Sequence, residues 1–214
     1  MNVERTDQLL TDWCREHLDA DVVGIRQQAR WRPVWFVDVE RDGETTTIMV
    51  RGDRTDAAPL FPLEHEMRFQ QLLEADGIPV AHVYGWVDEP RAFAIDVVPG
   101  ENNFDASTDA ERAAVMDEYM GILARIHALD PEPYARAGIT RADTPAGSGR
   151  VGLDVYVAGY RATKRRPDPF LEFCLGWIDR NPVDTRGREA PVVWDSGQFP
   201  PQGGHVTAVL DLEL

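Results

Sequence analysis

The chain has 214 residues, 43% of them hydrophobic, which suits one globular unit of two lobes or one and a half domains. Its 22 basic and 37 acidic residues give a formal net charge of −15. A nucleic-acid backbone or an anionic membrane would be repelled by this charge. We therefore expect no nucleic acid and no membrane among the partners.

Cysteine usage and the chain start indicate a cytoplasmic protein. Cys14 and Cys174 lie far apart, without the paired spacing of a metal site or disulfide framework, so we expect reduced thiols. The first ten residues are charged and lack the apolar core of a signal peptide. No apolar run approaches the roughly 18 residues that a membrane span needs.

The first 97 residues are predicted to form an antiparallel sheet with one inserted helix. Apolar residues recur at helical spacing over 5–19 and again over 62–77. Asp42-Gly43 is a strong hairpin signal between two of the strand-like stretches. Those stretches are 21–28, 33–40, 45–52, 78–88 and 92–98.

The second half is predicted to be mainly helical and to end in a β-hairpin. Val98-Pro99-Gly100 breaks the strand pattern and indicates a connector between two lobes, 1–97 and 98–214. The expected elements after it are helices over 109–130 and 167–182, an exposed loop over 136–150, and strands over 190–195 and 205–214.

Three polar residues of the terminal segment are candidates for a cation site. Asp195 and Asp211 come at or near the ends of the two predicted strands, and Gln198 lies in the turn region between them. Their carboxylate and amide oxygens suit a hard cation such as Mg²⁺. The alternative is an ordinary hairpin in which the aspartates cap turns.

The terminal segment resembles that of the aminoglycoside phosphotransferase and choline kinase-like family. The stretch VTAVLDLEL is similar to the family's final strand, which implies that Asp211 binds metal. By the same match, Gln198 takes the place of the family's asparagine and Asp195 that of its catalytic aspartate. Val193 and Trp194 stand where histidine and glycine are usual, and Asp195 precedes Gln198 by three residues where the family has five. Either the loop is shortened by two residues, or Asp195 has another role.

The N-terminal half resembles the same family. In IMVRG, Arg51 matches the strand cation that holds nucleotide phosphates, and in PLEHEMRFQQLL, Glu66 matches the helix glutamate that holds this cation. Glu64 is the second choice for that glutamate. Lys164, the single lysine, lies in the other half of the chain, so arginine takes the role with its planar fork. The alternatives are a solvated strand end for Arg51 and an exposed helix charge for Glu66.

The connector is similar to the family's hinge, which implies that backbone groups from Asp96 to Val98 bind adenine. A glycine-rich phosphate loop is missing, since GIRQQARWRP occupies its place with a single glycine. Gln27, Gln28 and Arg30 are the polar residues that could substitute for it.

The resemblance covers roughly residues 20–214 and implies an α+β, protein-kinase-like two-lobe fold that ends before it is complete. The implied function is ATP- and Mg²⁺-dependent phosphoryl transfer to a hydroxyl of a small molecule. Arg51 and Glu66 would hold phosphates, Asp211 and Gln198 would hold Mg²⁺, and Asp195 would take the hydroxyl proton. An incomplete fold would also leave an apolar C-terminal strand exposed and prone to self-association.

Two other readings stay open from the sequence. A degenerate kinase-like domain would bind nucleotide or metabolite without turnover, which the arginine at position 51 and the altered loop around Trp194 favour. A non-kinase α+β scaffold with an accidental match is the third reading.

Overall fold

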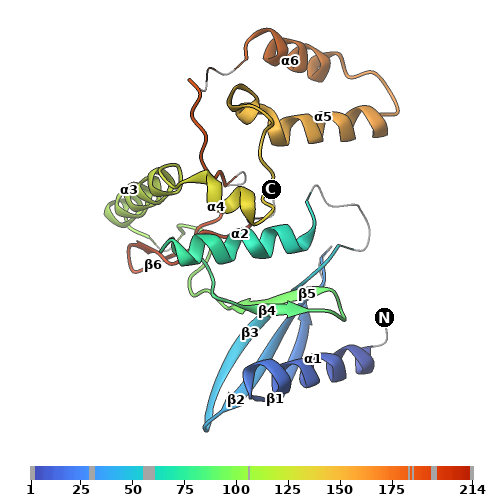
Figure 1. Cartoon of the computed structure of the whole chain (residues 1–214). Helices are drawn as coiled ribbons and strands as arrows, with labels where there is room; N and C mark the ends of the chain where they lie inside the picture. Colours follow the sequence, from blue (N-terminus) through green and yellow to red (C-terminus); the bar gives the residue numbers. More distant parts are fainter. Residues whose placement is uncertain are drawn as a thin grey trace. The chain divides into compact units, whose positions relative to one another are not determined.

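The computed structural model describes residues 3–28, 32–54, 61–105, 107–182, 184, 186–193 and 197–212 (Figure 1). Its helices are α1 Val3–Leu18, α2 Leu63–Ala75, α3 Asp109–Ile126, α4 Pro131–Arg136, the 3-10 helix η1 Pro145–Arg150, α5 Val151–Thr163 and α6 Pro169–Arg180. Its strands are β1 Asp21–Gln28, β2 Val34–Arg41, β3 Glu44–Gly52, β4 Val83–Val87, β5 Ala92–Asp96, β6 Pro201–Gln202 and β7 His205–Val206. The predicted α+β class is confirmed, with an antiparallel sheet in the N-terminal part and helices with a hairpin after it.

The chain packs as two compact units. The first comprises Met1–Ile126 together with Val193–Leu214, and the second comprises His127–Val192. The terminal segment therefore belongs to the same packed unit as the sheet. These two units are defined by which residues pack together and do not test the lobe boundary that we expect after residue 97. That boundary stays a prediction. Within the described residues, no helix is both long enough and apolar enough to span a membrane.

In the described part of the first unit, five strands form an antiparallel sheet in the order β1-β2-β3-β5-β4. Successive side chains of a strand point to opposite faces, and both faces are apolar here. Ile48 and Val50 of β3 belong to the core on the α1 face, whereas Met49 belongs to the core on the α2 face. Helices α1 and α2 accordingly lie on opposite sides of the sheet (Figure 1). By the same alternation, Arg51 faces α2.

The terminal segment differs from the prediction in its strands and in its exposure. Residues 190–193 of the strand predicted over 190–195 form no strand, and 194–195 lie outside the described residues. The strand predicted over 205–214 is only His205–Val206, and residues 207–212 continue without regular strand pairing. We expected an apolar patch on an exposed C-terminal strand, but Val206, Val209 and Leu212 are 7%, 1% and 3% exposed. The backbone N–H of Val209 donates to the carbonyl oxygen of Pro79 at 2.8 Å, so this segment packs into the first unit. Leu214 lies outside the described residues.

The second unit contains α4, η1, α5 and α6. Helix α6 confirms the helix predicted over 167–182, whereas α4 and α5 were not predicted. The loop expected over 136–150 includes η1. Three aromatic side chains of α6 are largely exposed: Phe170, Phe173 and Trp177.

The packing of α1 predicts different reactivities for the two thiols. Cys14 is fully buried against the sheet, and burial raises its pKa to about 11, whereas Cys174 on α6 is half-buried. We expect DTNB at pH 8 to modify Cys174 first and Cys14 only after denaturation, because the thiolate is the reacting form. A Cys174→Ser variant isolates Cys14. Rapid labelling of that native variant would show that α1 does not stay docked.

Candidate functional site

The centre of the candidate site is an ion pair between β3 and α2. Arg51 Nε lies 2.9 Å from Oε1 of Glu66, whose side chain is only 4% exposed. The close approach predicted for this strand cation and helix glutamate is therefore present. Glu64, the second choice, forms its ion pair with Arg91 instead. Position 66 faces the sheet and position 64 does not, because residues two apart lie on different sides of a helix.

Glu66 has a second cationic partner that the sequence analysis did not identify. Arg32 Nη1 lies 3.1 Å from the other carboxylate oxygen, Oε2, and the Arg32 side chain is only 6% exposed. Arginine is seldom buried to this degree unless it is paired. Its position in GIRQQARWRP carried no signal that separated it from Arg30, which lies outside the described residues.

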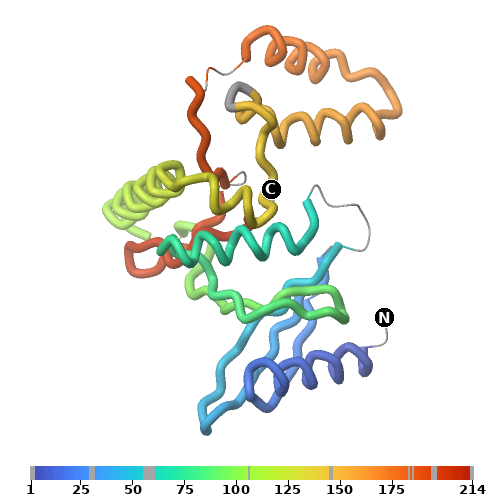
Figure 2. Tube along the Cα trace, viewed as in Figure 1, coloured from blue at the N-terminus to red at the C-terminus, as the bar shows by residue number. Residues whose placement is uncertain are grey.

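Asp211 joins the terminal segment to this pair. Its Oδ1 accepts a hydrogen bond from Arg51 Nη2 at 2.8 Å, so one guanidinium contacts Glu66 through Nε and Asp211 through Nη2. Asp211 has a φ of 58°, in the left-handed region that aspartate enters more readily than most residues. Arg51 and Asp211 are thus adjacent in the fold. Figure 2 shows the red C-terminal hairpin of the first unit beside helix α3.

Gln198 lies beside Asp211, as predicted. Its side-chain amide donates to Oδ2 of Asp211, and its backbone carbonyl accepts from the N–H of Leu210 at 2.8 Å. The next residue, Phe199, stacks on Tyr119 of α3 with ring centroids 3.8 Å apart. Helix α3 therefore supports the backbone that carries Gln198.

The connector after β5 is fastened to the hairpin. The hydroxyl oxygen of Thr207 lies 2.8 Å from the carbonyl oxygen of Pro99 and 2.8 Å from that of Pro200, so its proton is shared between the two acceptors. Gly100 has a φ of 98°, and a Cβ there would lie 2.8 Å from the Pro201 carbonyl oxygen. Only glycine fits this approach without a shift of the backbone. The connector and the segment that carries Asp211 are thus held together within the first unit.

The hinge residues Asp96 and Val98 lie at and just after the end of β5. The backbone N–H of Asp96 donates to the carbonyl of His82 at 3.0 Å, and its carboxylate accepts from the Tyr84 hydroxyl at 2.6 Å. Burial, followed by this hydrogen bond, raises the pKa of Tyr84 to about 12, so the phenol stays protonated and donating. Val98 packs against the apolar cluster under α2.

Asp195, the predicted catalytic residue, lies outside the described residues, as does Trp194. Among the residues that the structure describes, no group of three or more His, Cys, Asp or Glu side chains could hold a metal ion. A cation at Asp211 and Gln198 would need further ligands from a substrate, such as phosphate oxygens.

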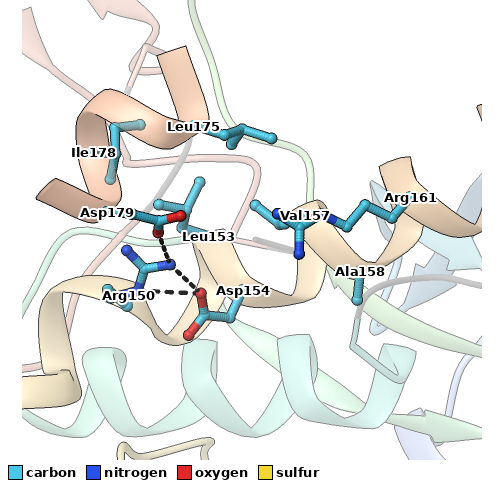
Figure 3. A pocket seen from close by; sticks show the side chains of 9 residues that line it. All are labelled: Arg150, Leu153, Asp154, Val157, Ala158, Arg161, Leu175, Ile178 and Asp179. Atoms are coloured by element: carbon cyan, nitrogen blue, oxygen red, sulfur yellow. Dashed lines mark hydrogen bonds and ion pairs between the residues drawn. The ribbon is translucent and has the colours of Figure 1, made fainter. Parts of the chain in front are cut away.

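A separate cavity of about 220 Å³ lies in the second unit between α5 and α6 (Figure 3). Its polar part is centred on Arg150, whose Nη2 lies 2.8 Å from Asp154 and 3.0 Å from Asp179. Two carboxylates thus balance this guanidinium, which links the two helices. The apolar lining residues are Leu153, Val157, Ala158, Leu175 and Ile178.

Comparison with known proteins identifies the family. The model of the phosphotransferase enzyme family (APH) matches residues 21–214. The chain belongs to this family. No curated protein matches the sequence. The members of this family are ATP-dependent small-molecule kinases.

Solved structures of phosphotransferases share the kinase-like fold. A fructosamine-3-kinase homologue from Thermobifida fusca matches with a TM-score of 0.56 and 17% identity, covering 94% of this chain and 72% of its own. A thermostable mutant of aminoglycoside phosphotransferase APH(4)-Ia, in ternary complex with AMP-PNP and hygromycin B, matches with a TM-score of 0.60 and 14% identity. That match covers 95% of this chain and 70% of the transferase.

The two glutamates of α2 give a matched test of the site's energetics. Glu66→Gln should lower the free energy of unfolding by about 3 kcal/mol, because it leaves buried guanidinium charge without its carboxylate. Glu64→Gln should cost less than about 1 kcal/mol, because its pair with Arg91 is exposed. Urea unfolding of both variants measures the difference. Equal losses would show that Glu66 is not the buried centre of the network.

Proposed function

We propose that the chain binds ATP at the α2 side of β3 and transfers its terminal phosphoryl group to a hydroxyl of a small molecule. The observation that carries this proposal is the continuous contact from Glu66 through Arg51 to Asp211, which joins α2, β3 and the terminal segment. A guanidinium held on two sides is a preorganised cation for phosphate oxygens. Family membership supports the same chemistry.

Asp211 and Gln198 are the residues that would hold Mg²⁺. A carboxylate and an amide carbonyl are suitable oxygen donors, and one or two protein ligands with substrate phosphates are usual for this ion. The ion, when bound, would neutralise negative charge on the phosphate oxygens. The Asp211 oxygens contact Arg51 and Gln198, which keeps the carboxylate in place.

The remaining roles rest on the family resemblance. The backbone from Asp96 to Val98 would bind adenine, since this connector continues from the strand that pairs with β3. Asp195 would accept the proton of the attacking hydroxyl as the new bond to phosphorus forms and the bond to ADP breaks. The relative's complexes with AMP-PNP or ADP and hygromycin B support a nucleotide and a small-molecule acceptor as the two substrates.

A binding module without turnover is the second candidate. The arginine at position 51 and the Val193-Trp194 pair before Asp195, where the family usually has histidine and glycine, favour it. Both candidates predict nucleotide binding, and only the first predicts ADP release that depends on an acceptor.

Asp211→Asn tests the nucleotide site. With Mg²⁺ and ATP at 100 times its Kd, binding should stabilise the wild type by about 2.7 kcal/mol, seen as a rise in Tm. The variant should lose most of this rise, because the amide has no charge for the cation. Asp12→Asn, on the exposed side of α1, is the matched control and should respond as the wild type does. A full Mg²⁺–ATP response in the Asp211 variant would refute the assignment.

Turnover separates the two candidates. We expect ADP formation from ATP to increase when a suitable hydroxylated small molecule is added from a panel, and to fall at least about 100-fold in Asp195→Asn. Nucleotide binding in that variant should remain. Tight ATP binding without acceptor-dependent ADP release across the panel would favour the binding module. Equal turnover in the variant and the wild type would exclude Asp195 as the proton acceptor.

A further inference from the structure

Two arginines share one buried carboxylate at the candidate site. Glu66 presents Oε1 to Arg51 Nε at 2.9 Å and Oε2 to Arg32 Nη1 at 3.1 Å. The side chains of Arg32 and Glu66 are almost completely buried, whereas that of Arg51 is 17% exposed. Arg51 is therefore the more accessible of the two cations, and Arg32 lies behind the shared carboxylate.

The backbone holds Arg32 beside β3. Val34, two residues after Arg32, pairs with Arg51 in the sheet. The N–H of Gly52 donates to the carbonyl oxygen of Pro33 at 2.8 Å, and a Cβ at position 52 would lie only 3.0 Å from that oxygen. The absence of a side chain at Gly52 thus allows the segment that contains Arg32 to approach the end of β3.

The contact of Arg32 affects how Glu66 can hold Arg51. An isolated arginine–carboxylate pair often forms side by side, with one guanidinium taking both oxygens. Because Arg32 engages Oε2, Glu66 meets Arg51 through Oε1 and the Nε edge. Nη2 of Arg51 then reaches Asp211 at 2.8 Å, on the side where the proposed function places phosphate and cation.

Arg32 also changes the charge balance. The guanidiniums of Arg32 and Arg51 both contact the carboxylate of Glu66, and that of Arg51 also contacts Asp211. If Asp211 instead ligates a cation, Glu66 is still shared between two arginines. The Nη2 side of Arg51 would then be directed at a phosphate while Nε stays on Glu66. The sequence between β1 and β2, residues 29–33, contains no glycine, so the Arg51 guanidinium would contribute what a backbone phosphate loop supplies elsewhere.

We propose that Arg32 is a positioning residue of the nucleotide site, acting through Glu66 to aim Arg51 at the phosphates of ATP. The inference rests on the proposed function, since it assigns a further residue to the same site. A residue that only stabilises the fold would affect all ligands alike. A residue that aims a phosphate-binding cation affects ATP and leaves adenosine unchanged.

The test compares Arg32→Met and Arg32→Lys with Arg91→Met. Arg91 is a matched control, because it pairs with Glu64, which is on α2 like Glu66, and this pair is exposed. Dissociation constants for Mg²⁺–ATP and for adenosine are measured by calorimetry on variants with wild-type circular dichroism. We expect Arg32→Met to weaken ATP binding by at least about tenfold, a difference of about 1.4 kcal/mol, with adenosine affinity unchanged. Arg32→Lys should weaken ATP binding less, and Arg91→Met should have no effect.

A double variant distinguishes action through Arg51 from an independent effect. If Arg32 acts through Arg51, adding Arg32→Met to Arg51→Met should cause no further loss of ATP affinity. Additive losses, equal weakening of ATP and adenosine, or wild-type ATP affinity in the Arg32 variants would overturn the inference. If Arg32→Met does not fold, Arg32→Lys decides by the same ATP-to-adenosine comparison. Failure of the wild type to bind ATP would overturn the proposed function itself, and the inference with it.

Discussion

The buried carboxylate of Glu66 is the interaction on which the site depends. Removing an ionised carboxylate from water costs several kcal/mol, and attraction to cations must offset that cost. Glu66 is 4% exposed, and its two oxygens meet guanidiniums from different parts of the first unit. Helix α2 cannot shift along the sheet without separating at least one of these pairs. The same charges that need compensation therefore fix the distance between α2 and β3.

The sheet contributes to the site through ordinary strand alternation. On β3, Ile48 and Val50 enter the core beneath α1, and Met49 and Arg51 point to the α2 face. Burial of the apolar residues sets the register, and a slip of one residue would move Arg51 to the wrong face. Hydrophobic packing therefore determines which face of the sheet the Arg51 side chain points to, and electrostatics determines its partners there.

Arginine at position 51 contacts two carboxylates through two different nitrogens, whereas a lysine would have a single nitrogen for both. Its Nε and Nη2 atoms are fixed in one plane, and they meet Glu66 and Asp211 respectively. One rigid group on β3 therefore bridges helix α2 and the terminal segment, although Arg51 and Asp211 are 160 residues apart along the chain. On the other side, Phe199 stacks on Tyr119 of α3 and Thr207 hydrogen-bonds to Pro99 of the connector, and both contacts hold that segment in place.

Local patterns in the sequence predicted the elements of the sheet, α1, α2, α3 and α6, because each depends on periodicity and turn chemistry over a few residues. The Arg51–Glu66 pair was predicted from family resemblance and strand position. Helix α5 was missed, since its valines and glycines favour other structures locally and its helical form depends on its context.

Long-range packing determined the features that local patterns do not contain. Residues 207–212 are mostly apolar, which suits a buried strand, yet their backbone bonds to loop groups such as the Pro79 carbonyl. The burial of Arg32 arises because Gly52 has no side chain to keep Pro33 away from β3. An arginine is exposed in most sequence contexts, and a buried carboxylate 34 residues away along the chain compensates its charge here.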